Sequence, residues 1–294
     1  MPQFSIIIPT YNREDLLRET LESVIPNADP KVEIIVIDDG STDESFAYLE
    51  SLGSRVRVFK QSNQGPGAAR NLGIENATGD YLVFLDSDDL FFPWTLDTIR
   101  EVILATQAKL VFGKPYRFTE SAANCQQESL SFLSFADYYA SGDTWRWWGV
   151  SSFIIHRSLL QDVRFLTASI NAEDADLVMQ LGDAGKLAQI TAPHTFAYRE
   201  HDGSVMKNWD KNLAGVWNLV SNEKSQLFPG GRARQRERWR ILGRHLRPVI
   251  LESLRGGHRQ EGVKLLRATL RWHLADRRFR FLAASLFHLI GFQR

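Results

Sequence analysis

Residues 81–89 read YLVFLDSDD, a short apolar run that ends in three carboxylates. A run of this length, bounded by polar turn residues, is typical of a buried strand. Two earlier stretches have the same form, IIIPTYN at 6–12 and IIVIDDG at 34–40. The three stretches predict buried strands, each with polar residues directly after its carboxyl end.

Between these strands, apolar residues recur at the spacing of amphipathic helices. Such stretches lie at 16–24, 46–52, 68–76, 94–106 and 173–181, and further strands are expected at 56–59, 110–112, 149–155 and 187–192. Strands that alternate with helices predict an α/β fold with a mostly parallel central sheet flanked by helices. Ligands of such sheets bind beyond the carboxyl ends of the strands, where the acidic residues fall.

The chain of 294 residues has no net charge, but its charges are unevenly divided. Residues 230–294 hold 16 Lys and Arg against 4 Asp and Glu, whereas residues 1–229 hold 19 against 31. From residue 208 onward only helices are expected, with FPGG at 228–231 as a linker. We therefore expect two domains, an α/β domain over 1–207 and a basic helical C-terminal region over 208–294.

Two uses of the basic region remain open. Basic amphipathic helices with Trp and Phe often lie on anionic membrane surfaces. Alternatively, the region packs on the α/β domain and leaves its basic face in solvent. Nucleic acid is not an expected partner, because no recognised nucleic-acid-binding motif accompanies the charge.

Composition excludes several classes of protein. Hydrophobic residues at 44% and charged residues at 24% are ordinary globular values. The single Cys125 excludes a disulfide framework and a cysteine-based zinc site. We expect no signal peptide, and the apolar run at 281–292 is too short to span a bilayer. The expected location is the cytoplasm, free or peripheral on the inner face of the membrane.

Asp86, Asp88 and Asp89 follow the strand expected at 81–85. Negative charges this close repel one another unless a cation or hydrogen-bond donors offset them. Oxygen ligands without nearby His or Cys favour Mg²⁺ or Mn²⁺ over zinc. The alternative is that Ser87 or Asp88 caps the next helix and the other carboxylates are solvated. For three carboxylates together we favour a metal site.

The polar residues after the first two strands allow two interpretations each. Asp38 and Asp39 could accept hydrogen bonds from a base or a ribose, or could form an Asx-turn with Ser41. Tyr11 could stack on a base, or lie half-buried in a loop. No Walker A motif and no G-x-G-x-x-G motif occurs, so a P-loop or dinucleotide fold is unsupported.

Four motifs occur in a fixed order: IIIPTYNR at 6–13, VIDDGSTD at 36–43, GPGAARNLGIENATGDYLVFLDSDD at 65–89 and AEDADLVMQL at 172–181. In this order and spacing they resemble the family 2 glycosyltransferases of the GT-A fold. The resemblance covers residues 3–205. It implies that a nucleoside-diphosphate sugar binds at the strand ends.

The resemblance also implies roles for single residues. Tyr11 would pack on the base, Asp39 would accept from it, and Asp86 would reach the ribose. Asp88 and Asp89 would supply the metal site of a DXD motif, with the ion bridging the diphosphate. The full set of implied nucleotide-sugar contacts is Pro9, Thr10, Tyr11, Asp39, Arg70, Asp86 and Ser87.

A catalytic base follows from the same resemblance. Asp174 of the Glu173–Asp174 pair would take the proton of the acceptor hydroxyl, help that is typically worth about 10²–10⁴-fold in rate. Without the resemblance, the pair would only favour the positive end of a helix dipole. Gln180 stands where many relatives carry Arg. His201 would approach the metal or the diphosphate, or be structural.

Three indoles, Trp145, Trp147 and Trp148, precede the strand expected at 149–155. Aromatic faces pack on the C–H faces of pyranose rings, so Trp147 and Trp148, with Glu173, are the expected acceptor contacts. The alternative is that they fill the core.

The resemblance, together with the acidic cluster, implies an inverting, metal-dependent glycosyltransferase. It would move sugar from a nucleoside-diphosphate sugar, with a UDP-sugar favoured, to a glycan or lipid-linked acceptor in polysaccharide or glycolipid synthesis. The alternatives are a sugar-1-phosphate nucleotidyltransferase and an inactive, transferase-like membrane assembly partner. The first needs a Gly-rich, basic loop after the first strand, which PTYNRED at 9–15 does not supply.

Overall fold

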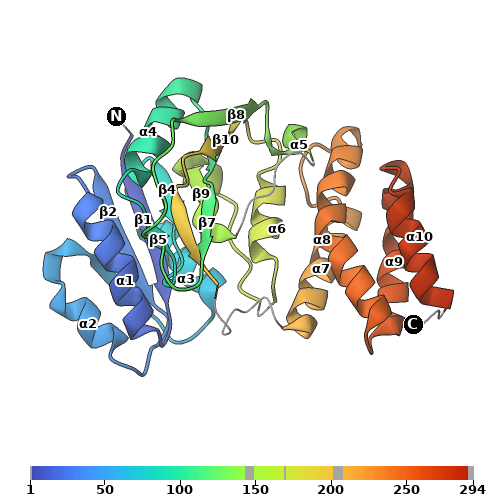
Figure 1. Cartoon of the computed structure of the whole chain (residues 1–294), viewed down its shortest axis with the longest axis horizontal. Coiled ribbons are helices and arrows are strands. Elements are labelled where there is room, and N and C mark those ends of the chain that lie inside the picture. Colours follow the sequence, from blue (N-terminus) through green and yellow to red (C-terminus); the bar gives the residue numbers. More distant parts are fainter. Residues whose placement is uncertain (1, 143–148, 169, 201–207, 291–294) are drawn as a thin grey trace. The chain divides into compact units, whose positions relative to one another are not determined.

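The computed structural model describes all residues except 1, 143–148, 169, 201–207 and 291–294 (Figure 1). The chain divides into two compact units. One, the α/β unit, comprises Met1–Ala136, Arg146–Ala168 and Ala184–Ser204. The other, the helical unit, comprises Asp137–Trp145, Ser169–Asp183 and Val205–Arg294. The expected domain boundary after residue 207 stays a prediction.

The α/β unit is built on an eight-stranded sheet of order β3-β2-β1-β4-β9-β6-β10-β8. Its strands are β1 (Phe4–Thr10), β2 (Val32–Asp38), β3 (Arg57–Lys60), β4 (Tyr81–Phe84), β6 (Leu110–Phe112), β8 (Ser131–Phe135), β9 (Phe153–His156) and β10 (Leu187–Ala192). Strands β3, β2, β1 and β4 pair in parallel, as do β6 and β10. Only β9 and β8 pair antiparallel with their neighbours. The predicted α/β fold with a mostly parallel sheet is confirmed.

Helices α1 (Glu14–Val24), α2 (Ser45–Ser51), α3 (Pro66–Asn76) and α4 (Thr95–Thr106) connect these strands. Alternate residues of β1 face opposite sides of the sheet. Ile6 and Ile8 share a buried cluster with Leu17 of α1, whereas Ile7 lies against α3. A Cβ at Gly73 of α3 would lie 2.4 Å from Ile7 Cγ2, so glycine allows α3 to pack directly on β1.

A second, three-stranded sheet was not expected from the sequence. It has the order β5-β11-β7, from β5 (Leu90–Phe91), β11 (Phe196–Arg199) and β7 (Pro115–Phe118). These strands and β8 are short and mixed in polarity, so they leave no clear apolar run. The strand expected at 149–155 begins only at Phe153, because Val150–Ser152 forms a 3₁₀ turn after Gly149, whose φ is 70°.

The regular elements described between residues 209 and 290 are helices, as predicted: α7 (Trp209–Lys224), α8 (Gln235–Arg255), α9 (Arg259–Ala275) and α10 (Phe279–Ile290). The expected FPGG linker falls between α7 and α8. Two earlier helices, α5 (Tyr138–Ser141) and α6 (Glu173–Gln180), belong to the same helical unit. In the part of the chain that the structure describes, none of the helices is both long and apolar enough to cross a membrane.

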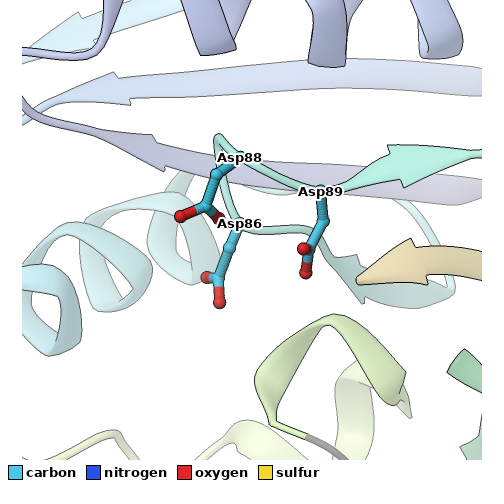
Figure 2. Close-up of side chains that lie close together, drawn as sticks. All are labelled: Asp86, Asp88 and Asp89. Carbon is cyan, nitrogen blue, oxygen red and sulfur yellow. The ribbon is translucent and has the colours of Figure 1, made fainter. Parts of the chain in front are cut away.

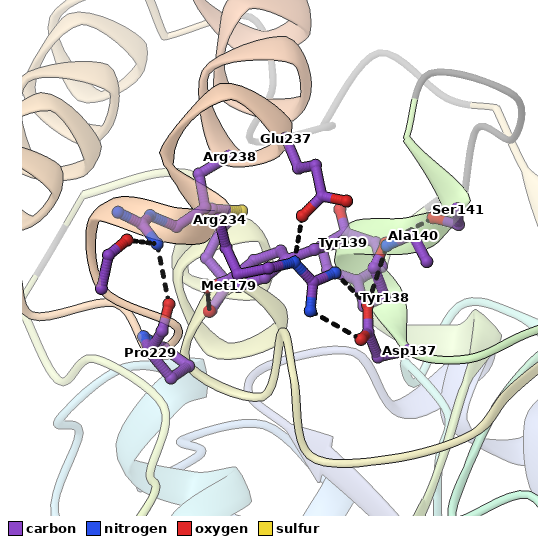
Figure 3. Close-up of polar contacts among 11 residues, drawn as sticks. Asp137, Tyr138, Tyr139, Ala140, Ser141, Met179, Pro229, Arg234, Glu237 and Arg238 are labelled. Carbon is purple, nitrogen blue, oxygen red and sulfur yellow. Dashed lines mark hydrogen bonds and ion pairs between the residues drawn. The ribbon is translucent and has the colours of Figure 1, made fainter.

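Polar contacts fix α5 to the N-terminal part of α8 (Figure 3). Arg234 donates two hydrogen bonds of 2.8 Å to the carboxylate of Asp137, the residue that caps α5. Tyr139 is fully buried and its hydroxyl donates to the carbonyl of Met179 on α6. A Cβ at Gly182, the second residue after α6, would lie 1.9 Å from Tyr139 Cζ, so this position requires glycine.

A buried ion pair joins α7 to α8. Arg238 and Glu223 are 1% and 2% exposed, and Arg238 Nε donates to Glu223 Oε2 at 2.7 Å. Arg238 also donates to the carbonyls of Pro229 and Gly231 in the linker, at 2.8 and 2.9 Å. Through these two hydrogen bonds the buried guanidinium of Arg238 holds the linker turn in place.

The carboxylate of Glu33 on β2 joins neighbouring parts of the α/β unit. It accepts hydrogen bonds from Ser5 Oγ and from the N–H of Thr78 and pairs with Arg57. Burial alone raises the pKa of Glu33, but these hydrogen bonds outweigh it and lower the pKa to about 2. The associated stability is therefore present above the unfolded pKa of 4.5 and is lost as the pH falls towards 2.

We expect Glu33→Gln to lower the free energy of unfolding at pH 7 by about 1–2 kcal/mol, because buried donors lose a charged acceptor. The loss should shrink at pH 3. Urea unfolding at both pH values measures it, with the exposed Glu50→Gln as control. A loss of equal size at both pH values would contradict the assigned pKa.

Candidate functional site

Three strands of the main sheet end side by side. In the parallel register Thr10 of β1 lies opposite Asp38 of β2, and β4 pairs with the other edge of β1. Pro9 and Thr10 are buried, and Tyr11 is 43% exposed. Thr10 Oγ1 is buried without a hydrogen-bond partner among the described residues. A buried hydroxyl with no partner at a strand end is a group that a bound ligand can satisfy.

The two aspartates after β2 have different surroundings. Asp38 is fully buried and accepts from the N–H of Ser41 at 3.1 Å, which is the turn contact that the sequence allowed. Asp39 is 4% exposed and accepts three hydrogen bonds from the loop before α3. The donors are Gln61 Nε2 at 2.7 Å and the N–H groups of Gln64 and Gly65 at 2.9 and 2.8 Å.

Gly40 makes this arrangement possible. Its φ is 82°, and a Cβ there would lie 2.9 Å from the nitrogen of Asn63. The loop over 61–65 can therefore approach the end of β2 closely, and the carboxylate of Asp39 holds it there. Asp39 thus holds the loop at the strand end where the sequence analysis placed a base.

The acidic residues after β4 form a cluster on one turn. Ligand oxygens of Asp86, Asp88 and Asp89 all lie within 4.8 Å of one another, and Figure 2 shows the three side chains on the same side of the loop. The N–H of Asp89 donates to the carbonyl of Asp86 at 3.1 Å, which closes the turn. Strand β5 follows this turn, so the alternative of a helix cap at Ser87 or Asp88 is wrong.

Asp89 fixes the turn to the rest of the α/β unit. It is 1% exposed; Ser151 Oγ donates to one carboxylate oxygen at 2.6 Å and the N–H of Arg199 to the other at 3.1 Å. Burial raises the pKa of Asp89 well above its usual range, and the nearby charges of Asp88 and Asp86 raise it further. The turn therefore places one fully buried carboxyl group next to two partly exposed carboxylates.

Asp86 and Asp88 are partly exposed, and each pairs with an arginine. Arg70, 4% exposed on α3, donates to Asp86 Oδ1 at 2.7 Å. Arg13, at the start of α1, pairs with Asp88. Ser87 between them is buried. Together with Ser151 and Arg199, these two arginines bring four segments of the chain to one acidic turn.

Sequence reasoning did not find two of the residues that shape this site, Arg13 and Ser151, and it left Arg199 as either a phosphate contact or an exposed residue. Arg199 on β11 also donates through Nε to the carbonyl of Asp88 at 3.0 Å and pairs with Glu19. Its guanidinium carbon lies 4.7 Å from the centroid of the Phe118 ring. The second sheet therefore supports the acidic turn, and the short strand β11 carried no signal of it.

The donor set fits a hard divalent cation. Three carboxylates on one turn provide oxygen ligands only, and two of them are partly exposed. Mg²⁺ and Mn²⁺ prefer such ligands. Asp86 and Asp88 are the residues best placed to hold the ion, since both oxygens of Asp89 already accept hydrogen bonds within the protein.

The predicted base and its neighbours lie in the helical unit. Glu173 and Asp174 form the first turn of α6, and Asp174 Oδ1 accepts from the N–H of Ala175 at 2.6 Å. Their roles stay predictions. Trp145, Trp147, Trp148 and His201 fall outside the described residues.

The structure explains the glutamine at position 180. Asp176 is 1% exposed, and burial raises its pKa. Gln180 donates to it at 2.7 Å, and Asn222 and Asn218 of α7 donate at 2.6 and 3.3 Å. Three neutral amides thus satisfy a buried carboxyl group and tie α6 to α7.

Comparison with known proteins identifies the family of the chain. The family model described as glycosyl transferase family 2 matches residues 5–180. The chain belongs to glycosyltransferase family 2. The matched segment contains the strand ends, the acidic turn and the Glu173–Asp174 pair.

Bacterial proteins are among the curated relatives of this family 2 glycosyltransferase. Glycosyltransferase GlyG of Streptococcus pneumoniae is 29% identical over 238 residues, covering 72% of this chain and 77% of GlyG. An uncharacterized glycosyltransferase of Rickettsia felis is 52% identical over 91 residues, 30% of this chain. That match spans only 15% of the length of the Rickettsia protein.

Solved structures share the fold. Staphylococcus aureus TarS 1-349 in complex with UDP-GlcNAc has a TM-score of 0.59 at 18% identity, covering 95% of this chain and 91% of that one. The mannosyltransferase PcManGT of Pyrobaculum calidifontis, in complex with GDP-Man and Mn²⁺, has a TM-score of 0.52 at 17% identity, covering 98% and 86%.

Arg13 and a divalent cation would compete for the same carboxylate. We expect Arg13→Ala to tighten Mn²⁺ binding to the nucleotide-free protein several-fold, because Asp88 loses a competing positive charge. Titration followed by Mn²⁺ electron paramagnetic resonance measures the effect. The control is Arg18→Ala, one turn further along α1, where the guanidinium pairs with Glu14. Unchanged or weaker Mn²⁺ binding in Arg13→Ala would contradict the prediction.

Asp39 should determine the order of the loop over 61–65. In Asp39→Asn one oxygen becomes an NH₂ group that cannot accept, so at least one of three hydrogen bonds is lost, at a cost of about 1–3 kcal/mol. We expect the amides of Gln64 and Gly65 to exchange hydrogen about tenfold faster or more. The exposed Asp97→Asn serves as control. Equal exchange rates in Asp39→Asn and wild type would show that the loop is held by other contacts.

Proposed function

We propose that this glycosyltransferase transfers a sugar from a nucleoside-diphosphate sugar to an acceptor hydroxyl with inversion at the anomeric carbon. The observation that carries the proposal is the meeting of Thr10, Asp39 and the acidic turn at the carboxyl ends of neighbouring parallel strands. That edge is where α/β sheets bind nucleotides. Family membership favours glycosyl transfer over the nucleotidyltransferase alternative.

The site offers a surface for each part of a nucleotide. The exposed ring of Tyr11 would stack on the base, and Asp39 with the loop over 61–65 would border it. The buried Thr10 hydroxyl would find its missing partner there. The solved neighbours bind UDP-GlcNAc, UDP or GDP-Man. They support a nucleoside diphosphate, and we favour uridine as in the TarS complexes.

The diphosphate would lie next to the acidic turn. Asp88 and Asp86 would hold Mg²⁺ or Mn²⁺, with Asp89 and His201 as further candidates. The ion would offset charge on the departing nucleoside diphosphate. Arg13 and Arg70 already lie at this turn, and their positive charges would favour the phosphates.

Asp174 would act as the base. As the acceptor oxygen attacks the anomeric carbon, its proton would pass to the Asp174 carboxylate and the bond to the diphosphate would break. Attack from the face opposite the leaving group inverts the configuration. Glu173, Trp147 and Trp148 would contact the acceptor, which we propose to be a glycan or a lipid-linked saccharide of a cell-surface polymer.

Two variants separate binding from chemistry. Asp174→Asn should lower turnover by about 10²–10⁴-fold, because the proton acceptor is lost, and leave the affinity for UDP unchanged. Asp88→Asn should instead weaken Mn²⁺-dependent UDP binding. Donors are first chosen by thermal shift with UDP, GDP and dTDP in the presence of Mn²⁺, since a ligand of the folded state raises the melting temperature. Turnover is then followed by NMR.

The control is Asp183→Asn, an exposed carboxylate close to the end of α6. Full turnover in Asp174→Asn would remove the base assignment, and a product with retained anomeric configuration would contradict inversion. Silence with every donor, with and without Mn²⁺, would favour the inactive, transferase-like alternative.

We also propose that the protein works at the anionic inner face of a membrane, where a lipid-linked acceptor would be found. The support for this location is the excess of positive charge over residues 230–294.

A further inference from the structure

Helix α10 is apolar on both of its faces. Phe281 and Ser285 are buried, with the Phe281 ring centroid 4.6 Å from that of His273 on α9. On the other side Phe279, Leu286 and Phe287 are 61%, 56% and 51% exposed. The positions 279, 283, 286 and 287 share one face of a helix, and position 283 is an exposed alanine. A helix of a water-soluble protein normally has polar residues on its outward face.

The outward face of α9 mixes apolar and basic residues. Leu265 and Trp272 of α9 point inward and are buried. Leu270 and Leu274 are 41% and 47% exposed. The exposed arginines at 267 and 271 lie on the same face, each three positions before one of these leucines. This face therefore has the composition of a helix that lies on an anionic surface.

The turn between α9 and α10 adds positive charge. Arg277 and Arg280 are exposed there. The carboxylate of the turn, Asp276, pairs with Arg240 at 3.1 Å and with Arg278 at 2.6 Å. Its negative charge is thus offset within the protein, and the arginines at 277 and 280 dominate the charge next to the exposed Phe279.

Helix length limits how α10 could meet a membrane. Its 12 residues extend about 18 Å, well short of the roughly 30 Å of a hydrocarbon core. It can therefore lie in the interface but cannot cross it. A second copy of the chain is a poorer occupant, because the arginines of two such faces would repel each other.

We propose that the outward faces of α9 and α10 form a membrane-docking surface for anionic phospholipid bilayers. Phe279, Leu286 and Phe287, with Leu270 and Leu274, enter the headgroup region, and the surrounding arginines contact lipid phosphates. The proposal rests on the peripheral location proposed above and names the surface responsible. Vesicle binding needs neither donor nor metal, so its failure and a failure of the proposed chemistry are distinguishable.

The test is co-sedimentation of the full chain with vesicles. We expect binding to vesicles of 30% phosphatidylglycerol in phosphatidylcholine, little binding to pure phosphatidylcholine, and weaker binding as NaCl is raised. The double variant Leu286→Ser/Phe287→Ser should bind at least about tenfold more weakly. Arg271→Gln/Arg280→Gln should weaken binding to a similar extent and reduce its salt dependence.

Controls separate docking from folding. Leu104→Ser removes an equally exposed leucine, 52% exposed, from α4 of the α/β unit and should bind vesicles like the wild type. Circular dichroism and UDP binding should be unchanged in every variant, because the substituted side chains are exposed.

Several results would overturn the proposal. These are equal binding of wild type and the α10 double variant, binding that ignores lipid charge, and absence of binding to anionic vesicles. A concentration-dependent dimer that Leu286→Ser/Phe287→Ser abolishes would overturn it as well and assign the face to a second copy.

Discussion

A buried carboxylate holds the acidic turn in its shape. Asp89 has almost no contact with water, and it persists there because Ser151 and the backbone of Arg199 donate to its two oxygens. The Asp89 side chain is buried, whereas the side chains of Asp86 and Asp88 on the same turn are partly exposed. Burying one carboxyl group beside two others is unfavourable on its own. The arginines at positions 13 and 70 and the second sheet all serve to keep this concentration of charge in place.

The main features of the fold could be predicted because they depend on local patterns. The strands β1, β2 and β4 are continuous apolar runs, and parallel strands with polar ends must bring those ends to one edge. The placement of Asp38, Asp39 and the acidic turn follows from this. The order of the motifs indicated the family, which the match over residues 5–180 confirms.

The contacts that shape the site could not be predicted in the same way. Arg13, Ser151 and Arg199 meet the acidic turn from 75, 62 and 110 residues away along the chain. No periodicity links such residues, and β11 is too short for a distinct apolar run. Gln180 was noted as a departure from the family pattern, but its reason lies in two asparagines of α7. Long-range polar pairing is a property of the folded chain that local sequence does not encode.

The helical unit is assembled from both the middle and the end of the chain. Tyr139 and Asp176 are buried against residues of α6, α7 and α8, and Asp137 is bonded to Arg234. A chain cut after residue 207 would leave Asp176 without the two asparagines of α7 that donate to it, and Asp137 without Arg234. The C-terminal helices are therefore not a detachable anchor. Shortened forms would lose the support of α6 together with the outward faces of α9 and α10, so the proposed membrane docking has to be examined with point substitutions on the outer surface.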